Sequence, residues 1–76
     1  PRMTLSLTHD QALVLFDWLS REDRSNNIGT EHPAELSVLW DIEGQLERAL
    51  VEPLQVNYSA AVSAARERIT QLDPPP

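Results

Sequence analysis

The feature that most constrains the fold is the stretch from Pro33 to Val51, the longest run of apolar residues at helical spacing in the chain. Its apolar side chains gather on one side of the helical repeat and its polar ones on the other, as in an amphipathic helix that buries one face. The apolar side comprises Leu36, Leu39, Ile42, Leu46, Ala49 and Leu50. We therefore predict a helix of about nineteen residues here, with the rest of the domain packed around it.

The length of the chain allows one domain with a small core. A chain of 76 residues buries only about 60% of the surface that its unfolded form exposes. Because it has no cysteine, disulfides and thiolate-bound metals cannot reinforce that core, which leaves oligomerisation as a supplement. We predict a single domain over residues 1–73 and a disordered proline tail over residues 74–76. The lack of cysteine also fits the cytoplasm, and no apolar run approaches the roughly 20 residues of a membrane helix.

The charge of the chain excludes one class of partner and permits another. Twelve Asp and Glu residues against six Arg and no Lys give a net charge of −6 and a pI near 4.6. Such a surface repels phosphate backbones, so we expect no direct binding to nucleic acid. It keeps a small protein soluble and would suit a basic protein partner.

The N-terminal segment has the pattern of a strand. Met3, Leu5 and Leu7 alternate with polar residues, as in a strand buried on one face. A single strand needs a partner for its backbone donors and acceptors. The candidates are residues 54–56, residues 27–30, or the same strand of a second chain.

A helix is predicted to follow this strand. Thr8 and Gln11 have the spacing of a capping box, in which each side chain bonds the backbone N–H of the other residue. We expect the helix to end near Arg21 or Asp23. Its predicted apolar face consists of Ala12, Leu15, Phe16, Trp18 and Leu19.

Leu13 is the residue that does not fit this face. It lies between Asp10 and Asp17 on the side that we expect to be polar, so it is predicted to be an exposed apolar side chain. Asp17 is also placed to form a favourable pair with Arg21, one helical turn later.

A third helix is predicted after Pro53, which interrupts the second because it lacks a backbone N–H. Asn57 is a suitable N-cap for a helix over residues 58–72, in which small alanines share one face with larger apolar residues. The fold predicted is therefore mainly α and marginally α+β. It consists of a short N-terminal strand and three helices, with the second helix packed against both others.

Three segments together resemble a known group of proteins. LSLTHDQALVLFDWLSR, VLWDIEGQLERALVEP and NYSAAVSAARERI are similar to a group of short, acidic bacterial open reading frames that share the strand, the capping box, the LWxxE helix and the VEP break. The group has no assigned activity. The resemblance implies a stand-alone domain in a bacterial cytoplasm, and it implies no catalytic or binding residues.

Neither catalysis nor metal binding is predicted. His9 and His32 each lie beside carboxylates, but His32 and Glu35 supply only two ligands, and a metal site in a helical bundle needs several inward-facing groups. The chain has no cysteine, no nucleophile elbow and no phosphate-binding glycine loop. We therefore expect no enzymatic activity and no cofactor.

Glu43 is the charge that most needs an explanation. It projects within the apolar side of the central helix, and a buried acid needs a partner. Arg68 borders the apolar face of the third helix, so we predict a buried ion pair between these two residues. The alternative is that Glu43 lies at the mouth of the core and reaches water.

A second flank of the central helix is also apolar, and it carries Trp40, Gly44 and Val51. Glycine costs about 1 kcal/mol relative to alanine within a helix, so the close approach of another backbone would explain Gly44. That backbone belongs either to the same chain or to a partner.

These features predict a small non-enzymatic interaction protein that self-associates as a homodimer. The alternative is a neutraliser, such as an antitoxin or immunity protein, whose acidic face covers a basic partner. The residues predicted to form the interface are Leu13, Trp40, Gly44, Val51, Met3, Leu5 and Leu7.

Overall fold

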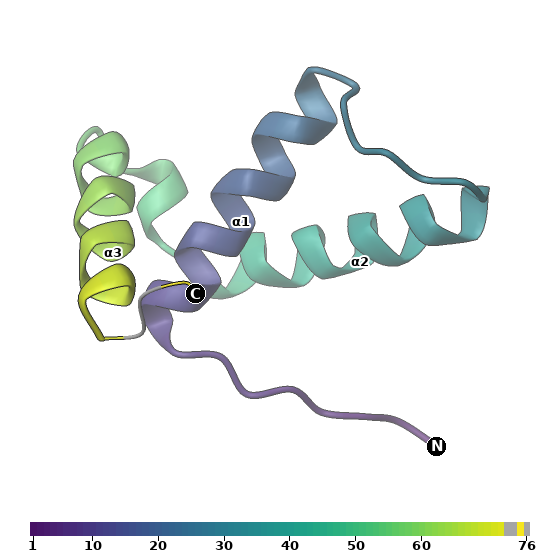
Figure 1. Cartoon of the computed structure of the whole chain (residues 1–76), viewed down its shortest axis with the longest axis horizontal. Helices are drawn as coiled ribbons and strands as arrows, with labels where there is room; N and C mark the ends of the chain where they lie inside the picture. The colour runs from purple at the N-terminus through teal and green to yellow at the C-terminus, as the bar shows by residue number, and fades with distance from the viewer. Residues whose placement is uncertain (73–74, 76) are drawn as a thin grey trace.

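The computed structural model describes residues 1–72 and 75. Within them the chain forms three α-helices, α1 (His9–Arg24), α2 (Pro33–Ala49) and α3 (Tyr58–Leu72), with a short 3-10 helix, η1 (Glu52–Leu54), between the last two (Figure 1). The prediction of a mainly helical fold is confirmed. Apart from Pro75, the predicted proline tail lies outside the described residues, as does Asp73.

The first helix begins where its capping signal predicts. The Thr8 hydroxyl accepts a hydrogen bond from the backbone N–H of Gln11 at 3.1 Å, and the Gln11 side chain accepts one from the N–H of Thr8 at 2.9 Å. These two bonds satisfy donors that a helix start otherwise leaves free. The helix ends at Arg24, and Asn26 then adopts a left-handed backbone conformation (φ 58°), which asparagine tolerates better than most residues.

The second helix begins at Pro33, where a missing N–H costs nothing. The residue before it, His32, is the N-cap, and its Nδ1 accepts a hydrogen bond from the N–H of Ala34 at 3.0 Å. Glu35 reaches back and accepts from the N–H of Glu31 at 2.8 Å. His32 is therefore engaged by its own helix.

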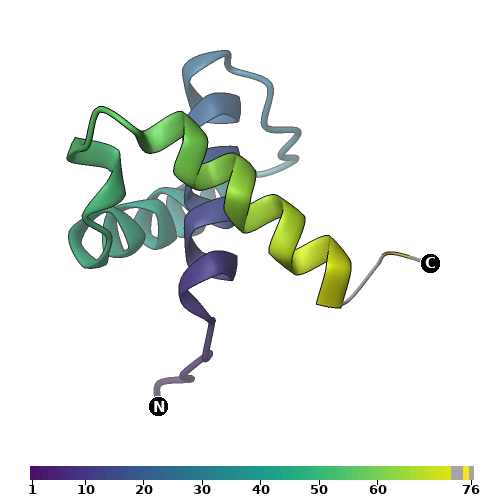
Figure 2. The same cartoon turned by 90° about the vertical axis from the view of Figure 1, so that its left-hand side faces the viewer.

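The hub of the fold is α1, which packs against both α2 and α3. Figure 1 shows α1 between the other two helices, and in the turned view of Figure 2 α3 crosses it obliquely. The prediction that the second helix is central is wrong. Among the described residues none in α2 is fully buried, and the core consists of Leu13, Phe16, Leu19, Leu50, Val62 and Ala65.

The predicted N-terminal strand does not form within residues 1–72 and 75. Residues 1–7 run away from the helices without a neighbouring strand (Figure 1), and Met3 and Leu5 are 97% and 85% exposed. Residues 54–56, one of its possible partners, belong to η1 and the turn after it. An extended segment without a ladder of hydrogen bonds is not a strand. Nor is any helix in the described part of the chain long and apolar enough to cross a membrane.

Candidate functional site

The side of α1 that was predicted to be polar faces α3. Asp10, Leu13 and Asp17 follow one another at helical spacing, and Leu13 is only 2% exposed, in one core cluster with Val62 and Ala65. The prediction that Leu13 is exposed, and available as an interface residue, is wrong. The acids on either side of it are not left free, because each pairs with an arginine of α3.

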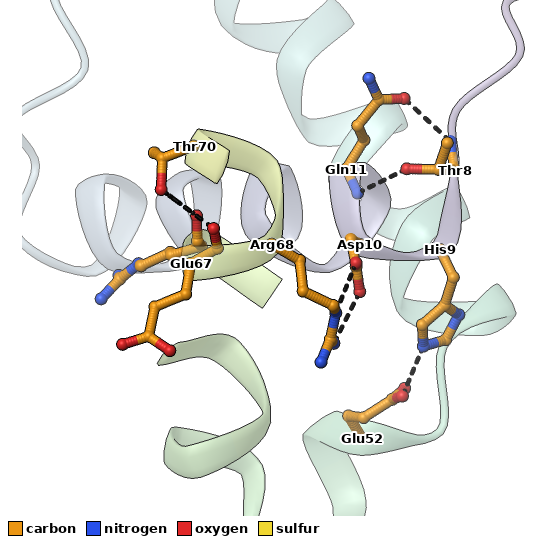
Figure 3. Close-up of polar contacts among 9 residues, drawn as sticks. Thr8, His9, Asp10, Gln11, Glu52, Glu67, Arg68 and Thr70 are labelled. Atoms are coloured by element: carbon orange, nitrogen blue, oxygen red, sulfur yellow. Dashed lines mark hydrogen bonds and ion pairs between the residues drawn. The ribbon is translucent and has the colours of Figure 1, made fainter. Parts of the chain in front are cut away.

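Asp10 pairs with Arg68 near the end of α3. The guanidinium donates through Nε and Nη2 to both carboxylate oxygens at 2.8 and 2.9 Å, which is a two-pronged geometry (Figure 3). This hydrogen bonding lowers the pKa of Asp10 and raises that of Arg68. The predicted ion pair between Glu43 and Arg68 is therefore wrong, because the charge of Arg68 is satisfied by α1.

A double-mutant cycle can distinguish these two pairings. We expect Asp10→Asn and Arg68→Gln to show a coupling energy above zero in urea unfolding, because they remove the same contact. Glu43→Gln and Arg68→Gln should be additive. If Asp10→Asn and Arg68→Gln were additive while Glu43→Gln and Arg68→Gln were coupled, the predicted ion pair between Glu43 and Arg68 would be correct.

Glu43 instead lies on α2, where it forms no ion pair with another described residue. Partial burial raises its pKa, and the nearby charges of Asp23 and Glu47 raise it further. This agrees with the alternative that Glu43 lies at the edge of the core.

Among the described residues, the side chain with the most polar partners is Asp17, which is 8% exposed. Its Oδ1 accepts a hydrogen bond from the Tyr58 hydroxyl at 2.7 Å. Its Oδ2 accepts from Arg21 Nε and from Arg66 Nη2, both at 3.0 Å. The predicted pair with Arg21 is confirmed, whereas the partners on α3 were missed. The only feature of the sequence that could have indicated partners on α3 is that Asp17 lies two helical turns after Asp10, on the same face of the helix.

Tyr58 is held in its neutral form by this setting. Burial raises the pKa of its hydroxyl to about 12, assisted by the hydrogen bond to Asp17 and the negative charge of that carboxylate. The charges of Arg24 and Arg21 act in the opposite direction. A neutral phenol can keep donating to Asp17 across the physiological pH range.

Tyr58 is the sole tyrosine, so tyrosinate absorbance reports it alone. We expect its titration midpoint near pH 12 in the folded protein and near the ordinary tyrosine pKa of 10 in urea. Because the folded pKa is the higher one, this contribution to stability is complete below about pH 10 and is lost as the pH rises to about 12. A folded-state midpoint at 10 would contradict the contact with Asp17.

A pocket opens beside this cluster, between α1 and α3. It has a volume of about 240 Å³. Its lining consists of Asp17, Arg21, Tyr58, Ser59, Val62, Ser63 and Arg66. Two arginines and two serines thus line one concave surface together with Asp17.

The two histidines are separated in the fold. His9 Nε2 lies 2.5 Å from Glu52 Oε2 (Figure 3), and this hydrogen bond is the main cause that lowers the pKa of Glu52. The other oxygen of Glu52 is buried without a hydrogen-bond partner among the described residues. His32 caps α2, and the described chain contains no group of three or more side chains placed to hold a metal ion.

The predicted flank of α2 is exposed, but it is not explained by a backbone contact. Trp40 is 52% exposed and donates from its ring nitrogen to Asp23 at 2.8 Å, while Val51 is 60% exposed. A Cβ on Gly44 would meet only the tip of Arg48, at 3.4 Å. No neighbouring backbone within the described chain therefore requires glycine at this position.

Comparison of the chain with protein-family models, with curated proteins and with solved structures finds no match. The similarity to short acidic bacterial proteins stays a prediction. Any function must be argued from the surfaces described above.

Proposed function

We propose that this chain is a small non-enzymatic protein-interaction domain that self-associates as a dimer. The observation that carries the proposal is the amount of exposed surface. The chain exposes 6163 Å², whereas a compact monomer of 8.6 kDa exposes about 4,700 Å². Part of the excess, roughly 1,500 Å², comes from residues 1–7, which extend away from the helices, and part from the exposed apolar side chains of α2 and η1.

Part of this excess surface is apolar and lies outside the core. In α2 and the connection after it, the exposed apolar residues are Val38, Trp40, Val51, Leu54 and Val56. The apolar stripe of α2 is only partly buried by its own chain, so packing against a partner would stabilise the helix further.

A second copy of the chain is the partner that the N-terminal segment favours. The alternating apolar side chains of Met3, Leu5 and Leu7 suit a strand, and residues 1–72 and 75 of one chain supply no strand to pair with. Pairing of this segment with its symmetry mate would satisfy both backbones at once and form an isologous interface.

Light scattering coupled to gel filtration tests the proposal. At micromolar concentration we expect a mass twice the chain mass of 8.6 kDa, falling toward the monomer on dilution. Leu5→Ser and Val38→Ser should shift the equilibrium toward monomer, since both side chains are exposed in the single chain. Thr4→Ser is the matched control and should leave the mass unchanged.

A monomer over the whole concentration range, with the two variants behaving like the control, would overturn the proposal. The alternative of an acidic neutraliser would then gain weight. Its signature is binding of a basic protein that weakens steeply as salt is raised, because exposed charges are screened.

A further inference from the structure

We propose that the pocket between α1 and α3 binds the phosphate group of a small phosphorylated molecule through Arg21, Arg66, Ser59 and Ser63. This goes beyond the proposed self-association and does not depend on it. The pocket is lined by residues from two helices and lies on a different face from the exposed side of α2.

The charge of the pocket is the opposite of the charge of the protein. Arg21 and Arg66 contribute two positive charges and Asp17 contributes one negative charge, so the group is cationic in a chain whose net charge is −6. Arg24 lies close enough for its charge to act on Tyr58. Two of the six arginines thus pair with Asp17, and a third acts on the neighbouring Tyr58.

The two lining guanidiniums still have donors to offer. Arg21 uses Nε and Arg66 uses Nη2 to bind Asp17, which leaves the remaining N–H groups of both forks free of that contact. Both side chains are about half exposed, at 47% and 48%, so they reach solvent at the pocket mouth. Asp17 therefore positions the two arginines without using up their hydrogen-bonding capacity.

The serines of α3 supply hydroxyl donors on the same side of the helix as Arg66. Ser59, Ser63 and Arg66 recur at intervals of four and three residues, so they form one stripe along α3. Arginine forks and serine hydroxyls are donors that suit phosphate oxygens. A tetrahedral group with several acceptors can use donors from two helices, whereas a planar carboxylate can use fewer of them.

The global charge decides the size of the ligand. A net charge of −6 opposes the approach of a polyanion such as nucleic acid, while a single phosphate interacts mainly with the local charge. The pocket volume of about 240 Å³ leaves room for atoms attached to the phosphate. A small phosphate monoester satisfies both conditions.

Nuclear magnetic resonance titration with inorganic phosphate, and separately with glycerol phosphate, tests the proposal. Ionic strength is held constant with sodium chloride. We expect saturable shifts of backbone amides confined to Arg21 and residues 58–66. Tighter binding of glycerol phosphate than of inorganic phosphate would show that the pocket prefers a phosphate ester. Equal binding would show that the pocket recognises the phosphate group alone.

Variants separate pocket binding from general charge. Arg66→Gln should weaken phosphate binding by about tenfold or more, because it removes a charged donor. Arg68→Gln removes the same charge two residues away, outside the pocket. It should change the dissociation constant for phosphate less than twofold, where a tenfold change corresponds to about 1.4 kcal/mol. Ser63→Asp is an exposed substitution that leaves the Asp17 contacts in place, and it should abolish saturable binding by like-charge repulsion.

Circular dichroism confirms that each variant is folded before titration. Non-saturating shifts in the unmodified protein would overturn the proposal. Equal weakening by Arg66→Gln and Arg68→Gln would overturn it as well, because the shifts would then report net charge. Unchanged binding in Ser63→Asp would place the anion elsewhere.

Discussion

Replacement of Leu13 by alanine should lower the free energy of unfolding by about 2–5 kcal/mol, as expected for a fully buried leucine that leaves a cavity. Leu13 is 2% exposed and belongs to the same core cluster as Phe16, Leu50, Val62 and Ala65. In a domain of 76 residues this is a large share of the total stability, so most molecules should unfold at moderate temperature. Urea unfolding followed by circular dichroism measures the loss.

Leu39→Ala is the matched control for this prediction. Leu39 lies at the middle of the apolar stripe of α2 but is only half-buried, so its loss should be clearly smaller than that of Leu13. Equal losses at both positions, or a larger one at Leu39, would mean that α2 and not α1 is the hub in solution. Dimer formation should be checked at the same concentration, because a partner that covers α2 would raise the cost of Leu39→Ala.

The helices were predictable because their signals are local. The capping box of Thr8 and Gln11 and the break at Pro53 each act within one or two turns of the chain. Each is present in the structure at or near its predicted position. Physical rules that depend only on neighbouring residues can be read from one sequence without knowing the fold.

The hub of the fold was not predictable by the same means. The stripe on α2 is the most regular in the chain, and such regularity predicts burial. The face of α1 that meets α3 contains Asp10 and Asp17, which made it look solvated. Their basic partners on α3 are 58 and 49 residues away along the chain. A pattern within one helix cannot reveal that a distant helix carries the complementary charge.

The predicted strand failed for a related reason. Alternation in residues 3–7 describes which side chains could share a face, but a strand also needs a second backbone beside it. The described part of a single chain supplies none. Of the candidate site, only the pair of Asp17 with Arg21 could be predicted, because it is the one contact of that cluster within a single helix.

Replacement of Asp17 by alanine is the second substitution with a large expected effect. It removes the acceptor of three hydrogen bonds and strands the Tyr58 hydroxyl in a partly buried position. We expect the free energy of unfolding to fall by about 1.5–3 kcal/mol, the range for a hydrogen bond to a charged group. The arginines contribute little to this loss, since both are half exposed and can turn to water.

Two further substitutions apportion that loss between the hydrogen bond from tyrosine and the charge of the acid. Asp17→Asn keeps an acceptor for Tyr58 and removes the charge, so it should cost less than alanine. Tyr58→Phe removes the donor, and in a double-mutant cycle with Asp17→Ala it should give a coupling energy of about 0.5–3 kcal/mol. If the coupling is zero while Asp17→Asn costs as much as alanine, the contact with Tyr58 contributes nothing. The buried acid would then stabilise the junction of α1 and α3 through its arginines alone.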